Sequence, residues 1–168
     1  DIGGESTRPG ATEVAQDDEL NRVIPVIKAI RQFSDILISI DTYKASVAEE
    51  AVLAGADIIN DVWGMQREPQ IASVAVKYNV PVIAMHNQSN NEYSEDIIIA
   101  MQNFFEKSLE IAKDAGLETS QIVLDPGIGF GKDADQNIVV LSRLSEVMGF
   151  GFPVLLGTSR KSMIGKIL

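Results

Sequence analysis

IVLDPGIGFGKD, residues 122–133, joins a short apolar run to a glycine-rich loop. The run 122–124 is followed by Asp125 and a break at Pro126, which is how a buried parallel strand reads where it meets a loop. Glycine then occupies every second position as far as Lys132. Such a loop can adopt positive φ and lets a ligand approach the backbone. The stretch therefore predicts a strand end beside a ligand site.

Two familiar glycine motifs do not fit this loop. A Walker A loop needs four residues between its glycines and then Lys-Ser/Thr, whereas three residues separate Gly127 from Gly131 and Asp133 follows Lys132. A dinucleotide fingerprint needs its third glycine at the position of Lys132. A tight connection from strand to helix, with no ligand, is the alternative for this segment taken alone.

The composition is that of an ordinary globular domain. The 168 residues are 45% hydrophobic and 23% charged, which is enough for a sizeable core. The net charge of −10 argues against a nucleic-acid partner. The absence of cysteine excludes disulfides and thiolate chemistry and suits a cytoplasmic location. We see no signal peptide and no apolar run of membrane-spanning length, so no membrane partner is expected.

The two ends of the sequence read as cuts through longer elements. Residues 1–4 begin without methionine and resemble the last residues of a strand entering a loop. Residues 161–168 stop within an expected helix. We expect the chain to be a fragment of a longer protein.

Apolar runs and helical spacings alternate along the chain. Strands are predicted at 36–40, 58–59, 80–85, 122–124 and 152–156, and helices at 17–33, 44–53, 68–78, 95–115, 134–147 and from 161 onward. Gly55 and Gly116 are expected to end the second and fourth helices, and Pro25 to kink or divide the first. This order predicts parallel strands covered by helices, as part of a (β/α)8 barrel or as a doubly wound sheet.

Polar side chains directly follow the predicted strands. They are Asp41, Asn60, His86, Asp125 and the segment 159–161. In a parallel barrel these ends open onto one face, where such enzymes keep their sites. Each residue also has a structural alternative. Asp41 or Asp61 can cap a helix, His86 can be a hydrogen-bonded structural group, and Trp63 and Phe130 can be packing residues.

The groups at the strand ends suit a flat heteroaromatic ligand. An aspartate accepts two N–H groups from an aminopyrimidine edge, and an asparagine complements a neighbouring donor–acceptor pair. Arg8, Lys132, Arg160 and Lys161 are candidates to hold an anion or a phosphate. The sequence has neither the ligand spacing of a zinc site nor a Gly-x-Ser-x-Gly elbow.

A series of motifs resembles the dihydropteroate synthase family of folate biosynthesis. In chain order they are GGESTRPGA, SIDTYK, INDVWG, MHN, LDPGIGFGK and LLGTSRKS. The resemblance covers essentially the whole chain and implies a (β/α)8 TIM barrel truncated at both ends. Residues 1–168 would be a single pterin-binding barrel domain that lacks the first and last strands. The implied activity is a transferase that joins 4-aminobenzoate to hydroxymethyl-dihydropterin pyrophosphate, releases pyrophosphate and is a target of sulfonamides.

The resemblance also implies roles for individual residues. The pterin pocket would be lined by Asp41, Asn60, Met85, Asp125, Phe130, Gly157 and Lys161. The aminobenzoate subsite would be formed by Thr7, Arg8, Pro9 and Ser159. The catalytic roles would fall to Asp41, Asp125 and Lys161, and none to His86.

Two family features lie outside this sequence, an asparagine on the first strand and an Arg-x-His on the last. Both contribute to the magnesium pyrophosphate site, so Mg²⁺ is an expected cofactor with its ligands beyond residues 1–168. The chain alone is expected to be catalytically weak or inactive, and the full-length protein is expected to be a homodimer. The alternatives are a pterin-binding methyltetrahydrofolate methyltransferase and a non-catalytic pterin-binding protein. STRPG and TSRKS favour the synthase, because a methyltransferase needs no aminobenzoate subsite.

Overall fold

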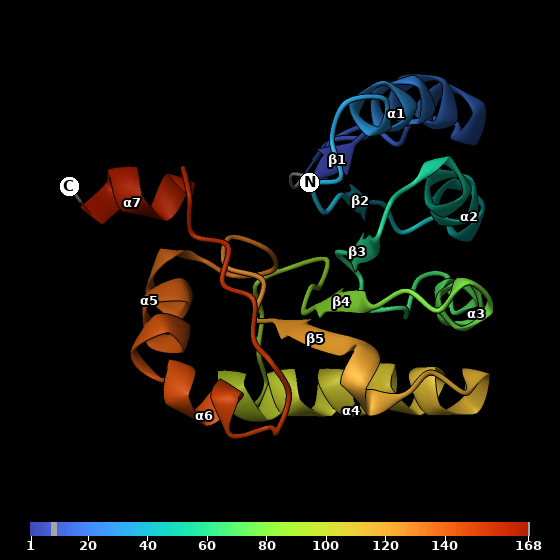
Figure 1. Ribbon diagram of the computed structural model, residues 1–168. Helices are drawn as coiled ribbons and strands as arrows, with labels where there is room; N and C mark the ends of the chain where they lie inside the picture. The colour runs from blue at the N-terminus through green and yellow to red at the C-terminus, as the bar shows by residue number, and fades with distance from the viewer. Residues whose placement is uncertain (8–9, 168) are drawn as a thin grey trace.

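The computed structural model describes residues 1–7 and 10–167, and this part of the chain forms one parallel sheet. Its strands are β1 (Ile2–Gly3), β2 (Ser39–Asp41), β3 (Ile58–Asp61), β4 (Val82–Met85) and β5 (Ile122–Asp125). Each strand pairs in parallel with the next one in sequence. A doubly wound sheet would reverse its strand order at a switch point, and this sheet does not. The fold is therefore α/β, and the sheet is an arc of a (β/α)8 barrel (Figure 1).

Helices follow the strands in the predicted alternation. They are α1 (Gln16–Arg31), α2 (Ala45–Ala54), α3 (Gln70–Tyr78), α4 (Ile97–Ala115), α5 (Ala134–Ser142), α6 (Leu144–Met148) and α7 (Ser162–Ile167), with a 3-10 turn η1 (Thr119–Gln121) before β5. Figure 1 shows α1 to α4 fanned along the outer side of the sheet. Among the described helices, none is both long and apolar enough to cross a membrane. Gly55 and Gly116 end α2 and α4 with φ of 117° and 86°, as predicted.

The core lies between the sheet and the outer helices. Ile40, Ile59 and Leu124, on three different strands, are completely buried. Ile27 of α1 and Phe105 of α4 are buried against them in the same cluster. This packing covers the outer face of the sheet, so the polar groups gather where the strands end.

Of the two outcomes predicted for Pro25, a kink or a division of the first helix, the division is wrong. Helix α1 continues through Pro25 from Gln16 to Arg31. Pro25 lies on the exposed side of α1, and so does Asn21, whose carbonyl loses its usual partner. Water can hydrogen-bond to that carbonyl, so the proline is tolerated within the helix.

The predicted helix over 134–147 is two helices. Helix α5 ends at Ser142 and α6 begins at Leu144, with Arg143 between them at φ −109° and ψ 22°. The Arg143 guanidinium forms ion pairs with Asp96 and with Glu146. The break is therefore held by side-chain contacts that a helical spacing does not show.

The strand predicted over 152–156 is reduced to one isolated bridge between Val154 and Leu124. The Leu124 N–H donates to the Pro153 carbonyl and the Leu155 N–H donates to the Leu124 carbonyl, at 2.9 and 2.8 Å. Pro153 has no N–H to extend this ladder. The strand predicted over 36–40 is also shorter, because β2 begins only at Ser39.

Candidate ligand-binding site

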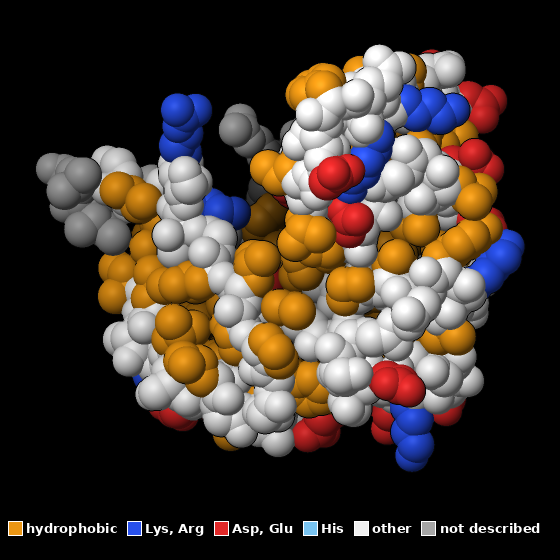
Figure 2. Space-filling view, viewed as in Figure 1, with side chains coloured by type: hydrophobic (Ala, Val, Ile, Leu, Met, Phe, Trp, Pro, Cys, Tyr) orange, Lys and Arg blue, Asp and Glu red, His pale blue; other side chains and the backbone are white. Residues whose placement is uncertain are grey.

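The carboxyl ends of the strands open into one cavity of about 850 Å³. All the predicted site residues within the described ranges line it: Thr7, Asp41, Asn60, Met85, Asp125, Phe130, Gly157, Ser159 and Lys161. Arg8 and Pro9, also predicted for the site, lie outside the described residues. Figure 2 shows the surface hollowed between the segment before α7 and the N-terminal part of the chain, with Lys and Arg side chains at its rim. The fold thus brings together residues that are far apart in the sequence.

Asp41 ends β2 with one oxygen that the fold does not use. Its Oδ1 is buried and accepts no hydrogen bond within the described part of the chain. Burial raises the pKa of Asp41 to about 7, and the carboxylates of Glu19 and Asp61 add to this effect. Buried polar atoms are almost always paired, and perturbed carboxylates in cavities mark functional sites. Asp41 is therefore a candidate acceptor for a ligand N–H group.

Asp125 ends β5 and shares its carboxylate between the loop and the cavity. Its Oδ1 accepts a hydrogen bond from the Gly127 N–H at 2.7 Å. Burial raises the pKa of Asp125, opposed by the Gly127 N–H and by the charges of Lys161 and Lys132. A Cβ at Gly157 would lie 3.9 Å from Oδ2, so glycine there keeps the second oxygen accessible.

Lys161 and Phe130 form a charged and an apolar wall of the same cavity. The Lys161 Nζ lies 4.4 Å from the centroid of the Phe130 ring. Phe130 also packs, with Trp63, against a small buried cluster of Tyr43, Val62 and Met85. The interpretation of Trp63 and Phe130 as packing residues is thus confirmed, although both also line cavities. An apolar wall between carboxylates, an amide and an ammonium suits a planar heteroaromatic ring.

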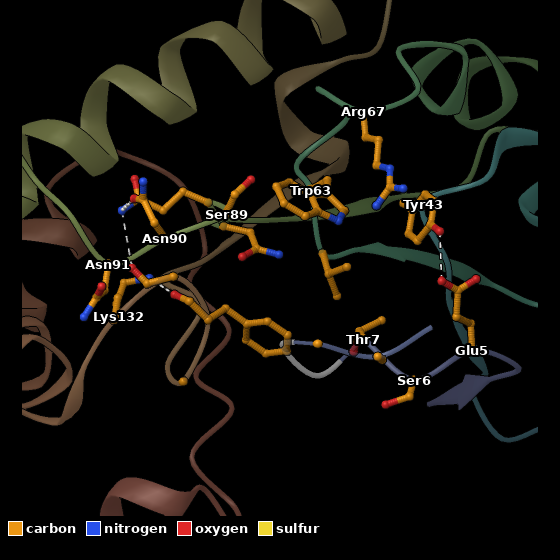
Figure 3. Close-up of a pocket in the computed structure, with 18 of the residues that line it drawn as sticks. Glu5, Ser6, Thr7, Tyr43, Trp63, Arg67, Ser89, Asn90, Asn91 and Lys132 are labelled. Atoms are coloured by element: carbon orange, nitrogen blue, oxygen red, sulfur yellow. Dashed lines mark hydrogen bonds between the residues drawn. The ribbon is translucent and has the colours of Figure 1, made fainter. Parts of the chain in front are cut away.

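A second cavity of about 500 Å³ adjoins the first and shares Thr7, Val62, Gly129 and Phe130 with it. Figure 3 shows Trp63 and Arg67 on one side, with Ser89 to Asn91 of the loop after β4 facing them. The Arg67 guanidinium lies 4.1 Å from the centroid of the Tyr43 ring. Sequence reasoning did not find this second cavity, because its walls come from loops with no common spacing.

A buried ion cluster anchors the loop that carries Thr7. The Lys44 Nζ donates to Glu19 Oε2 and to the Val14 carbonyl at 2.7 and 2.6 Å, and it also donates to Glu5. Burial opposes the charge of Lys44, but the carboxylates of Glu19 and Glu5 raise its pKa overall. The loop is therefore tied at both of its ends to the start of α2.

Sequence reasoning missed this cluster. Glu5 and Lys44 lie inside motifs quoted for the resemblance, so their positions carried a signal. Glu19 lies in the acidic first turn of α1, which normally indicates a solvated helix end. It is nevertheless only 1% exposed. Its role follows from contact with Lys44, which the sequence does not show.

The prediction that Asp41 or Asp61 caps a helix is wrong. The residues that precede α2 and α3 are Lys44 and Pro69, and neither helix has a side-chain cap. Asp61 instead closes the turn after β3, where its two oxygens accept from the N–H groups of Trp63 and Met65 at 2.8 and 2.6 Å.

The sequence suggested that Lys132 holds an anion, but the structure shows its amine bonded within the protein. Its Nζ lies 2.8 Å from His86 Nδ1 and donates to the carbonyls of Gly127 and Phe130 at 3.1 and 3.0 Å. Burial and the charge of Lys132 hold the pKa of His86 well below its usual range. The His86 ring packs against Phe104 at 4.9 Å between centroids. His86 is thus the hydrogen-bonded structural group that the alternative reading described.

Within residues 1–7 and 10–167, no group of three or more His, Asp or Glu side chains is placed to hold a metal ion.

Comparisons with known proteins agree on one family. A family model described as pterin binding enzyme matches residues 1–168. The chain is 53% identical over 171 residues to a dihydropteroate synthase of Clostridium beijerinckii, covering 100% of this chain and 62% of that protein.

Solved structures give the same result. The dihydropteroate synthase of Clostridium difficile, crystallised in the presence of pteroic acid, is 56% identical with a TM-score of 0.95 over 98% of this chain and 63% of that one. The Xanthomonas albilineans dihydropteroate synthase with 4-aminobenzoic acid is 39% identical with a TM-score of 0.93, over 99% of this chain and 60% of that one. The chain therefore spans less than two thirds of the length of these relatives.

Proposed function

Because the chain belongs to the pterin-binding enzyme family, we propose that the protein is a dihydropteroate synthase. The whole protein would condense 4-aminobenzoate with hydroxymethyl-dihydropterin pyrophosphate to give dihydropteroate and pyrophosphate. The observation that carries the proposal is the meeting of Asp41, Asn60, Asp125 and Lys161 in one cavity, with an Asp41 oxygen that accepts no hydrogen bond from residues 1–7 or 10–167.

The pterin would bind at the ends of β2, β3 and β5. Asp125 is the principal anchor in this proposal, because its second oxygen faces the cavity while the first is fixed by the Gly127 N–H. Asp41 and Asn60 would pair with other N–H and C=O groups of the ring, and Met85 and Phe130 would pack against its faces. The order of these ends along the sheet matches a ring whose polar edge carries several donors.

The reaction would require little acid–base catalysis. The lone pair of the aromatic amine forms a bond to the pterin methylene carbon, the carbon–oxygen bond breaks, and its electron pair leaves with pyrophosphate. The amine nitrogen then loses one proton to solvent. Asp41 and Asp125 would stabilise positive charge that develops on the pterin, since fixed charges aimed at developing charge are a major source of catalysis. Lys161 would stabilise negative charge near the leaving group.

Aminobenzoate, or a sulfonamide in its place, would bind beside Thr7 and Ser159. Both residues line the same cavity as the pterin candidates and come from loops on opposite edges of the sheet. Arg8 and Pro9 belong to this subsite in the proposal, which for them rests on the family resemblance alone. The related Xanthomonas albilineans structure with 4-aminobenzoic acid supports a subsite of this kind.

The rest of the proposal concerns the whole protein. Residues 1–168 would be one pterin-binding part of a (β/α)8 domain, whose other strands supply the pyrophosphate site. Magnesium would bind there and stabilise the departing pyrophosphate. A cytoplasmic location, which the absence of cysteine suits, and a homodimer of the full-length protein complete the proposal.

Pterin affinity of the whole protein tests the central assignment. Asp125→Ala should weaken binding of the pterin substrate by several kcal/mol, the order expected when a buried charged hydrogen-bond partner is lost. Asp35→Ala is the matched control, because Asp35 is exposed and follows α1 away from the cavity. Calorimetry that finds equal pterin affinity in both variants would exclude Asp125 as the anchor.

The second subsite needs a separate measurement. Ser159→Ala should raise the KM for 4-aminobenzoate and leave pterin binding nearly unchanged, because the two ligands would occupy different parts of the cavity. Steady-state kinetics with each substrate varied in turn separates the two effects. Equal losses for both substrates would count against two subsites.

A further inference from the structure

The glycine-rich loop 126–132 is tied to the protein by side chains at almost every residue. The Gly129 N–H donates to Asn137 Oδ1 at 2.7 Å, and the Tyr93 hydroxyl donates to the Gly131 carbonyl at 2.8 Å. A Cβ at Gly127 would lie 2.0 Å from the His86 carbonyl oxygen. The loop therefore lies directly against the end of β4, and glycine is needed for that close approach.

Lys132 makes the contact that connects these separate ties. Its Nζ reaches back across the loop to the carbonyls of Gly127 and Phe130 and to the ring of His86. His86 is itself fixed, because its backbone N–H donates to the Asp125 carbonyl at 2.9 Å and its ring packs against Phe104. One amine thus joins the loop to His86, the residue after β4, and through His86 to the end of β5.

Either protonation state of the amine has the donors and acceptors that these contacts need. A charged Lys132 donates to all three groups, whereas a neutral one donates to the two carbonyls and accepts from a proton on His86 Nδ1. Burial lowers the pKa of Lys132 to about 7, so both states are accessible near neutrality. The loop geometry is in this way insensitive to the charge of its own lysine.

Phe130 is the residue whose position depends most on this arrangement. Its carbonyl accepts from Lys132, and its N–H donates to the Gly127 carbonyl at 3.0 Å. Phe130 lines both cavities, and the Lys161 ammonium lies over its ring. A shift of the Phe130 backbone would therefore move a wall of the proposed pterin pocket.

We propose that Lys132 is a positioning residue, which sets Phe130 and the Asp125 end of β5 for the ligand through the His86 ring and two loop carbonyls. This inference rests on the proposed function, since it concerns the same pocket. Lys132 does not touch the ligand and takes no part in bond making. The alternative is a lysine that contributes to stability and leaves the ligand unaffected.

Three variants of the whole protein separate these possibilities. Lys132→Met keeps the length of the side chain but removes its donors. Lys77→Met is the matched control, because Lys77 is exposed on α3 and paired with Glu49. Lys132→Cys, alkylated with 2-bromoethylamine in denaturant and refolded, restores the amine on a side chain of nearly the same length. Residues 1–168 contain no natural cysteine, so no other position in this chain would be alkylated at a thiol. Wild type taken through the same cycle controls for refolding.

The readouts are the KM for the pterin substrate, kcat/KM, and hydrogen exchange of the amides of residues 127–131, all at a temperature where circular dichroism shows folded protein. Lys132→Met should lower kcat/KM roughly 10- to 100-fold, the size expected for a small misplacement of a site. Its loop amides should exchange faster. Lys77→Met should match wild type, and the aminoethylated cysteine should recover most of the loss.

Several results would overturn the positioning role. One is faster loop exchange with unchanged KM and kcat/KM, which would make Lys132 structural only. A second is that Lys132→Met changes neither the amide exchange nor the kinetics. A third is a loss of kcat/KM that restoring the amine does not reverse. A wild-type protein that fails to bind the pterin substrate contradicts the proposed function instead, and the exchange data then stand alone.

Discussion

Strands β2 and β3 lie side by side, and each ends on an aspartate, but the two carboxylates are used in opposite ways. Asp61 is completely buried, and both of its oxygens accept backbone N–H groups of the turn that follows. Asp41 is paired in the sheet with Asn60 and has a buried Oδ1 with no partner in the described part of the chain. Neighbouring sequence motifs of similar appearance, SIDTYK and INDVWG, thus hold one carboxylate with a buried oxygen that lacks a described partner and one carboxylate used by a turn.

The difference separates a carboxylate whose oxygens are hydrogen-bonded within the protein from one with an oxygen available to a ligand. Burial raises the pKa of Asp61 to about 6, although the N–H groups of Trp63 and Met65 lower it. The pKa of Asp41 rises to about 7 through burial and the nearby carboxylates of Glu19 and Asp61. An unpaired buried acceptor costs about 1–3 kcal/mol, a cost that a ligand donor can offset. The glycine loop after β5 resembles the Asp61 turn, because its polar groups are satisfied internally.

The largest predicted effect is in that loop. Gly127→Ala should lower the free energy of unfolding by about 4 kcal/mol or more, because its Cβ would meet the His86 carbonyl at 2.0 Å in a backbone with φ of 67°. Gly151→Ala is the control, since Gly151 has φ of 86° and open space around its Cβ.

The control isolates the close approach from the cost of left-handed backbone. Gly151→Ala should cost only the latter, about 1–2 kcal/mol. Urea denaturation of both variants measures the difference. Equal losses would mean that the loop can move away from β4, and the contrast between a fixed loop and an open cavity would then fail.

The second effect concerns the structural aspartate. Asp61→Asn should lower the free energy of unfolding by about 2–3 kcal/mol, because an NH₂ group would face one of the two N–H groups that Asp61 accepts. Denaturation at pH 7 measures it. A loss below about 0.5 kcal/mol, within the range of ordinary surface substitutions, would show that the turn does not depend on the carboxylate.

The sequence predicted the β–α order and the gathering of polar groups at the strand ends, because both follow from local patterns. Once the strands are parallel, the apolar runs that end on Asp41, Asn60 and Asp125 place these polar residues at one edge of the sheet. Some local signals were overlooked. Asp133 and Gln136 form a capping box at the start of α5, a D-x-x-Q pattern that is visible in the sequence.

Other features cannot be read from sequence, because they depend on distant contacts. The pairing of Lys132 with His86 joins residues 46 positions apart, and the pairing of Lys44 with Glu19 joins residues 25 apart. The length of the strand predicted over 152–156 depends on which strands lie beside it. No spacing distinguishes the unpaired Asp41 from the fully paired Asp61, because that difference lies in the turn geometry after each strand.

The smallest predicted effect has the opposite sign and separates the two aspartates most directly. In the folded protein the pKa of Asp41 is raised to about 7 from an ordinary value of 3.8, so the folded state holds a proton that the unfolded state loses between these two values. The contribution of Asp41 to the free energy of unfolding should therefore fall as the pH rises from 4 through 7. Asp41→Asn does not titrate there. Its free energy of unfolding should lie below that of wild type near pH 4, because the new amide group lacks partners at every pH, and should exceed that of wild type by about 1 kcal/mol at pH 8, where the wild-type carboxyl has lost its proton.

The same substitution at two neighbouring strand ends should thus stabilise the protein at one and destabilise it at the other. Pterin binding should weaken in Asp41→Asn, which removes an acceptor for the ligand. It should be unchanged in Asp61→Asn, which leaves the cavity lining intact. Denaturation from pH 4 to pH 8, with pterin calorimetry at pH 8, measures both. A loss of stability in Asp41→Asn at pH 8, or a difference from wild type that does not change with pH, would mean that the fold does use the Asp41 carboxylate. The unpaired oxygen would then no longer argue for a ligand at the end of β2.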